Sequence, residues 1–196
     1  MNKGSEPMVS QIIKISPSYQ TDYLTSSPHD IDRMIDVFHD RTYGWFLSYA
    51  EKLNKSKDTH CGFAVLQLLF HYFEMIEQYH RGIKTPTGES GNFFRAGVIK
   101  VFPTLSDAAL DILWKNARCG LYHSGMTSSH FFIMDGMDAI TMEGETVLVD
   151  RQKFTEKIAD HFKMYVQKLR SLENVDLRQN FRQFWEEINT GKIYSS

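Results

Sequence analysis

One segment of this 196-residue chain carries side chains suited to phosphate chemistry. It runs from Arg118 to His123, reads RCGLYH, and follows Lys115 and Asn116. A guanidinium offers paired donors to a phosphate, and an imidazole transfers protons near neutral pH. Together they can cleave a phosphodiester without a metal ion, because the arginine stabilises the charge of the transition state. The sequence therefore predicts that Arg118 and His123 are catalytic residues.

The spacing of these two residues limits how they can cooperate. Five residues of a regular α-helix turn about 500°, which leaves the two side chains about 140° apart around the axis. On one straight helix we expect His123 near the core-facing stripe and Arg118 pointing away from it. Cooperation then requires a break, which Gly120 or Gly125 would permit, or a second subunit that completes the site.

The motif lies at the end of a helix that the sequence predicts from Ser106 or Asp107, the fourth of the predicted core helices. In this motif and its placement, the sequence resembles the HEPN (higher eukaryotes and prokaryotes nucleotide-binding) superfamily. The signature of that family is an arginine followed after four to six residues by a histidine. The resemblance implies a homodimer that cuts RNA without a metal, with His123 transferring protons and Arg118 binding phosphate. Family members often have a polar residue directly after the arginine, where this chain has Cys119.

Residues beside the motif complete the predicted site. Lys115, Asn116 and Tyr122 are candidate substrate-binding residues, the first two because they are polar or cationic neighbours of Arg118. A purely structural interpretation remains open: Arg118 would pair with a surface carboxylate, His123 would end a helix, and Tyr122 would lie in the core.

Composition narrows the function further. The 24 acidic and 22 basic residues leave a formal charge of -2, so any RNA contact must be local. Cys61 and Cys119 suggest neither a disulfide framework nor a zinc site. The N-terminus lacks a secretory signal, and the apolar runs are too short to cross a bilayer. We expect a cytoplasmic protein without membrane association.

Histidine patterns that resemble metal sites have simpler interpretations. Glu77 and His80 match one Glu-x-x-His unit of a di-iron bundle, which needs a second unit that the sequence lacks. The His-Asp pairs at 29–30 and 39–40 fit a helix start and a solvated helix face. Phosphate-binding P-loops, nucleophile elbows and Cys-x-x-Cys pairs are missing from the sequence. We therefore predict no metal and no cofactor.

Apolar spacing predicts the helices that would position the motif. Stripes of helical period run from about 28 to 54 and from Asp58 or Thr59 to Gly82, and a shorter helix spans 92–101. Ser27 is expected to cap the first of them. A fourth helix begins at Ser106 or Asp107, leads into the motif and stops at Gly125.

The pattern of residue types changes after the motif. Short β-favouring runs separated by turn residues predict an antiparallel meander at about 130–150. Asp150 is expected to cap the next helix, and a capping box of Asp176 and Gln179 the last. The fold prediction is a mainly α, HEPN-like helical bundle with this small antiparallel β meander and two C-terminal helices. Residues 1–26 form an N-terminal arm, and 27–196 form one domain.

Three functional hypotheses follow. The first is a metal-independent RNA endonuclease of HEPN type, acting as a homodimer in a toxin, stress or phage-defence role, with a regulatory protein as a candidate partner. The second is a noncatalytic HEPN-like module that binds a nucleotide, RNA or a protein through the same groove. The third is a plain interaction domain that docks a partner on the apolar faces of its last two helices.

Overall fold

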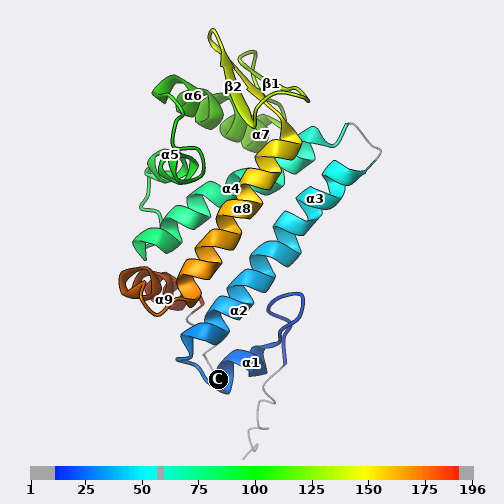
Figure 1. Cartoon of the computed structure of the whole chain (residues 1–196). Coiled ribbons are helices and arrows are strands. Elements are labelled where there is room, and N and C mark those ends of the chain that lie inside the picture. Colours follow the sequence, from blue (N-terminus) through cyan, green and yellow to red (C-terminus); the bar gives the residue numbers. More distant parts are fainter. Residues whose placement is uncertain (1–11, 57–59, 190–196) are drawn as a thin grey trace, which may run out of the picture.

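A computed structural model of the chain describes residues 12–56 and 60–189. The described part is mainly helical, with a small sheet at one end of the helices (Figure 1). Predictions for residues 1–11 of the N-terminal arm, for a helix start at Asp58 or Thr59, and for 190–196 lie outside the described residues. No helix in the described part is long and apolar enough to cross a membrane.

Two long helical segments and a third, later helix run side by side and form the body of the protein (Figure 1). The first consists of α2 (Ile31–Thr42), a π-helical turn η1 (Tyr43–Leu47) and α3 (Ser48–Lys55). The second is α4 (Gly62–Arg81), and the third is α8 (Arg151–Arg170). The two long apolar stripes predicted from the sequence are thus confirmed as helices.

The start of α2 differs from the prediction. Asp30, and not Ser27, is the N-cap: its carboxylate accepts hydrogen bonds from the backbone amides of Asp32 and Arg33. The backbone amide of Asp30 donates to the Ser27 carbonyl, so this stretch forms a turn before the helix. A carboxylate placed next to the first free amides satisfies them directly, and this decides where the helix begins.

The core is rich in aromatic side chains contributed by α2, α4, α8 and α9 (Val175–Asn189). Phe38, for example, has ring contacts with Tyr79, Phe162 and Phe181. The apolar faces of the last two helices belong to this core, in which their largest fully buried side chains are Phe154, Phe162, Tyr165, Phe181 and Trp185. These faces are therefore unavailable for the partner docking of the third hypothesis.

The remaining described part of the N-terminal arm also contacts the core. An isolated bridge joins Lys14 and Gln20, and α1 (Thr21–Thr25) follows it. Ile15 and Leu24 are buried with the core residues. The Ser16 hydroxyl donates to the carboxylate of Asp40 at 2.6 Å, which ties this stretch to α2.

The sheet corrects the predicted antiparallel meander. Its strands are β1 (Phe131–Ile133), β2 (Ile140–Glu143) and β3 (Thr146–Val149), in the order β1-β3-β2. β2 and β3 form an antiparallel hairpin, whereas β1 pairs with β3 in parallel, with Phe132 opposite Leu148. The connection from β1 to β2 carries the chain across the sheet, where the Gly136 amide donates to the Asp150 carboxylate at 2.8 Å.

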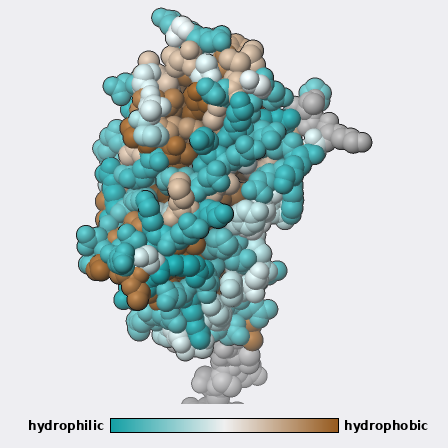
Figure 2. Space-filling model, in the orientation of Figure 1, coloured by the Kyte–Doolittle hydropathy of each residue, from teal (hydrophilic) through white to brown (hydrophobic). Residues whose placement is uncertain are grey.

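The motif lies in a helix built of three pieces: α6 (Asp107–Ile112), η2 (Leu113–Arg118) and α7 (Cys119–Ser124). The start at Ser106, whose hydroxyl caps α6, and the stop at Gly125 with φ 66° are both as predicted. A shorter helix, α5 (Ser90–Val101), packs against α4. The face shown in Figure 2 is mostly hydrophilic, with apolar side chains gathered toward the end that carries the sheet.

The two C-terminal helices begin differently. Asp150 caps α8 as predicted, accepting from the amides of Gln152 and Lys153. The last helix, α9, begins at Val175, so Asp176 lies in its first turn and is not the cap. The amide of Arg178 already donates to the carbonyl of Asn174, which places the helix start before Asp176.

Candidate functional site

The helix that carries the motif is interrupted by the π-helical turn η2, Leu113–Arg118. A π turn accommodates one extra residue, and such turns are frequent at functional sites. The extra residue rotates everything after it by about 100° relative to α6. As a result His123 is exposed, whereas the sequence placed it near the core-facing stripe. Leu121 is buried. The helix continues through Gly120 without a break.

Arg118 is held by aromatic rings and a carboxylate. Its guanidinium carbon lies 4.8 Å from the Trp114 ring centroid and 5.0 Å from the Tyr122 ring centroid. Its Nη2 atom lies 3.7 Å from a carboxylate oxygen of Glu74, and the Arg118 side chain is 25% exposed. The Ser90 hydroxyl at the start of α5 donates to the other Glu74 oxygen at 2.9 Å. Side chains of η2, α7 and α4, with Ser90 of α5 behind Glu74, thus fix the position of one cation.

A pocket of about 310 Å³ lies beside Arg118, between α4 and the motif helix. Polar and apolar side chains of α4 line the pocket on one side, and Arg118 and Tyr122 of the motif helix complete its lining. The α4 residues that line it are Gln67, Phe70, His71, Glu74, Met75 and Gln78. Gln67 also donates to the backbone carbonyl of Leu121 at 2.7 Å, which joins the two sides. The pocket is therefore a groove with a mixed polar and apolar lining.

The imidazole in this pocket is uncharged near neutral pH. Burial lowers the pKa of His71 to about 4. The Phe46 ring of η1 packs on it, with ring centroids 4.4 Å apart. Phe46 of η1 and Arg118 of η2 thus both contact side chains of α4 that line this pocket. The positive charge in the pocket comes from Arg118, and Glu74 offsets it.

Tyr122 stands between the two predicted catalytic residues. Its side chain is 69% exposed, so it does not lie in the core. The Tyr122 ring contacts the Arg118 guanidinium on one side. It also packs edge-to-face with the His123 ring, with ring centroids 5.0 Å apart. His123 is exposed and lies outside the pocket lining, and no contact joins it to Arg118 in the described residues. Within one copy, the two side chains are neighbours of Tyr122 but not of each other.

The other predicted substrate-binding residues face elsewhere. The Lys115 ammonium group pairs with Asp111 at 2.8 Å on the surface. Asn116 is half-buried, and its backbone carbonyl accepts from the Ser128 amide at 3.2 Å. Neither side chain lines the pocket beside Arg118.

Sequence reasoning missed the contribution of α4. Gln67, His71, Glu74 and Gln78 recur at steps of three and four residues on a mostly apolar helix. That spacing places them on one face. This polar stripe was the available signal for a groove. The partner of Arg118 in that stripe could not be chosen without the fold.

The histidine and carboxylate patterns do not assemble elsewhere. In residues 12–56 and 60–189, no group of three or more His, Cys, Asp or Glu residues is placed to hold a metal ion. Glu77 is buried and pairs with Arg81 and Lys100, at 2.5 and 3.3 Å. His80 packs on Tyr165, and burial lowers its pKa to about 3.

Comparisons with known proteins add no family to these observations. No protein-family model, no curated protein and no solved structure matches this chain.

Proposed function

We propose that this chain is a HEPN-like, metal-independent RNA endonuclease that acts as a homodimer in the cytoplasm. The observation that carries the proposal is the cluster of Arg118, Tyr122 and His123 at the end of the π-interrupted helix, beside a pocket lined by Arg118 and Tyr122. A phosphate binder, a stacking surface and an exposed proton carrier are then adjacent on one surface.

The chemistry needs only these groups and the RNA. A neutral His123 removes the proton of the 2′-hydroxyl, and the oxygen attacks the adjacent phosphorus. Arg118 stabilises the extra negative charge of the transition state. The bond from phosphorus to the 5′-oxygen breaks, and a protonated histidine returns a proton to that oxygen. The products are a 2′,3′-cyclic phosphate and a free 5′-hydroxyl.

The exposed ring of Tyr122 favours unpaired RNA as the substrate. Its side chain is 69% exposed, so an unstacked base can lie on it. Bases within a duplex are already stacked and cannot reach such a ring. The chain's formal charge of -2 also argues for local contacts of this kind over long-range electrostatic attraction.

The homodimer follows from the separation of the two catalytic residues. In one copy the guanidinium faces Glu74 and the pocket, whereas His123 is exposed. A two-fold axis near α7 would place two copies of His123 opposite each other and bring each toward the other copy's Arg118. A regulatory protein that covers α7 would then block both the dimer and the site, as expected in a toxin, stress or phage-defence role.

Cleavage of single-stranded RNA by purified protein in the presence of a chelator tests the proposal. We expect the cyclic phosphate product and its loss in His123→Ala and Arg118→Ala. His130→Ala is the matched control, because His130 is also exposed and contributes only its backbone carbonyl to the sheet. Activity retained in folded His123→Ala would refute the catalytic role of His123.

A second function is favoured by one observation. Arg118 is already paired with Glu74 and lies against two aromatic rings. An arginine held in this way can line a binding groove without taking part in bond cleavage. Binding of RNA or a nucleotide that depends on Arg118 and Tyr122, with no cleavage by the dimer, would identify the chain as a noncatalytic binding module.

A further inference from the structure

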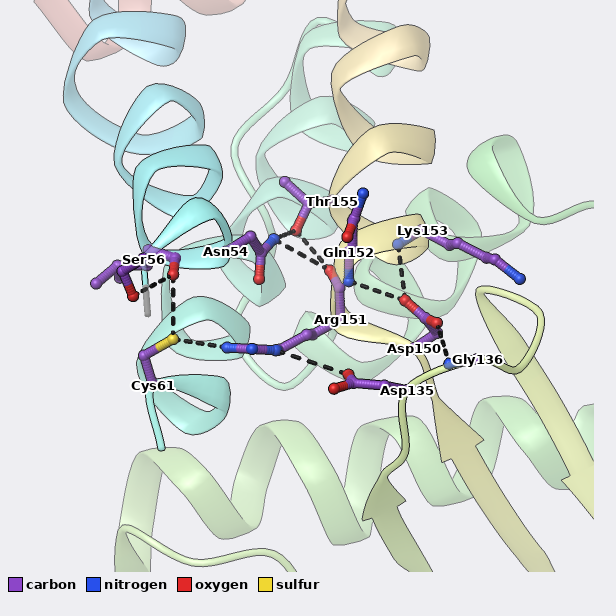
Figure 3. A network of polar contacts seen from close by, with 11 residues as sticks. Asn54, Ser56, Cys61, Asp135, Gly136, Asp150, Arg151, Gln152, Lys153 and Thr155 are labelled. Carbon is purple, nitrogen blue, oxygen red and sulfur yellow. Dashed lines mark hydrogen bonds and ion pairs between the residues drawn. The ribbon is translucent and has the colours of Figure 1, made fainter. Parts of the chain in front are cut away.

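Arg151, the first residue of α8, places a guanidinium in the interior of the protein. The residue is 8% exposed. Its side chain extends away from α8 toward the start of α4 and lies between Cys61 and Asp135 (Figure 3). A buried guanidinium is costly unless its charge and its donors are matched. What matters for Arg151 is therefore how the groups around it balance its charge and accept its hydrogen bonds.

The partners of this guanidinium leave much of its charge uncompensated. Nη1 lies 2.7 Å from the sulfur of Cys61, whose thiol itself donates to the Leu53 carbonyl at 3.3 Å. Nε lies 3.8 Å from a carboxylate oxygen of Asp135, beyond hydrogen-bond distance, and the Asp135 side chain is 73% exposed. In the described residues, Nε and Nη2 therefore have no hydrogen-bond acceptor.

Those donors border a pocket of about 260 Å³. Phe63 and Ile133 supply its apolar walls, and His60, Gly62 and Asp135 complete the lining with Arg151. The pocket lies at the start of α4, whose N-cap residue Cys61 makes no side-chain capping hydrogen bond. The first two residues of this 20-residue helix, Gly62 and Phe63, line the pocket, so the pocket adjoins the uncapped amides and the positive end of the helix dipole.

We propose that this pocket binds a small phosphate monoester. The phosphate accepts hydrogen bonds from Nε and Nη2 of Arg151 and from the first amides of α4, and the organic group lies between Phe63 and Ile133. Asp135 competes with it: its exposed carboxylate is near the guanidinium and moves into solvent when the phosphate enters. A tetrahedral dianion can accept hydrogen bonds from the guanidinium and from the amides at the same time. The Asp135 carboxylate, 3.8 Å from Nε of Arg151, does not do this.

This pocket is separate from the one beside Arg118. The two share no lining residue, and they lie along different parts of α4. Phosphate ester binding here does not depend on the proposed ribonuclease activity.

Titration calorimetry of the full chain with phenyl phosphate and with inorganic phosphate, in a low-salt buffer free of other phosphate, tests the proposal. We expect phenyl phosphate to bind more tightly than inorganic phosphate, because it also fills the apolar part of the pocket. Asp135→Asn should tighten binding roughly fivefold, the effect of removing one solvated like charge at contact distance. Arg151→Gln should abolish it.

Asp138→Asn is the matched control, since Asp138 is an exposed acid on the same connection and lies outside this pocket. It changes the net charge by the same amount as Asp135→Asn. The affinity for phenyl phosphate should stay within about twofold of the wild type, because the effect of a more distant charge is screened by solvent and salt. Asp135 is exposed, so the Asp135→Asn test does not depend on whether Arg151→Gln folds. No binding by either wild type or Asp135→Asn, or equal effects of Asp135→Asn and Asp138→Asn, would overturn the proposal.

Discussion

Gly97 of α5 lies so close to the backbone of Phe73 in α4 that a Cβ atom at position 97 would overlap the Phe73 carbonyl. Helix-to-helix contact at this distance is possible only for glycine, because any side chain must push the two backbones apart. The contact also sets the position of Ser90 at the start of α5, whose hydroxyl holds Glu74 beside Arg118.

Replacing Gly97 with alanine should therefore destabilise the protein. We expect Gly97→Ala to lower the free energy of unfolding by about 2 kcal/mol, because backbone atoms cannot yield as a side chain can. Urea unfolding measures this. Ile99→Ala on the same helix is the control: Ile99 is 44% exposed, so its loss should cost less. Equal costs would contradict the close contact.

Glu74→Gln should strengthen RNA binding if Arg118 contacts phosphate. Glu74 competes for the guanidinium at 3.7 Å, and its neutral isostere keeps the hydrogen bond from Ser90. We expect a roughly threefold tighter dissociation constant for single-stranded RNA in fluorescence anisotropy, as for the loss of one partly screened charge. Glu145→Gln, at an exposed turn, controls for net charge. Weaker binding by Glu74→Gln would argue that Arg118 needs its carboxylate to be positioned.

Stability should fall on mild acidification. Burial lowers the pKa of His71 and of His161 to about 4. In the unfolded chain a histidine takes up its proton near pH 6.5. Both states are neutral above that pH, so the stability is complete there. It is lost as the pH falls from about 6.5 toward 4, because only the unfolded chain binds the protons.

His161 offers a direct test of this pH dependence. The hydroxyl of Tyr72 lies 2.7 Å from Nδ1 of His161. Burial raises the pKa of Tyr72, so its hydroxyl stays protonated and can donate to the neutral imidazole. His161→Gln should reduce the stability lost between pH 7 and pH 5 by about 1 kcal/mol, allowing for partial solvent screening. Urea unfolding at the two pH values checks this, with His130→Ala as an exposed control. An unchanged loss in His161→Gln would exclude its contribution.

Asp150 connects the sheet to α8, so its replacement should destabilise both the start of α8 and the connection between β1 and β2. Its carboxylate accepts from the amides of Gln152, Lys153 and Gly136. Asp150→Ala should lower the free energy of unfolding by about 1–2 kcal/mol, the usual range for a lost N-cap. Asp150→Asn should cost less, because an amide oxygen still accepts. Asp160→Ala, an exposed acid on the same helix, should have a small effect in thermal unfolding. If Asp150→Asn cost as much as Asp150→Ala, the charge and not the cap would be responsible.

The parts of the fold that were predictable depend on local signals. Ser106, Gly125 and Asp150 end or begin helices as expected, because a cap acts on amides or carbonyls within the next turn. Ser27 was the wrong choice only because Asp30 offers a carboxylate closer to the first helical amides. Competition between adjacent caps depends on backbone angles that residue types alone do not specify.

The parts that were missed depend on contacts between distant segments. Parallel pairing of β1 with β3 comes from a crossing connection, and residue patterns do not distinguish it from a meander. The π turn that ends at Arg118 adds one residue to the helical register, which turns His123 away from the core. Arg118 itself could be identified by type and spacing, but Glu74 as its partner required the packing of α4 against the motif helix.

The strand order also determines when each part of the sheet can form. β2 and β3 are adjacent in the chain and meet through the turn at Gly144, so their hairpin closes a very short loop. β1 precedes both strands but can pair only with β3, so it has no edge to join until β3 is in place. We therefore expect Phe131, whose buried ring contacts Phe70, to enter the core late in folding. Thr146–Val149 is the strand whose delay would hold back the whole sheet.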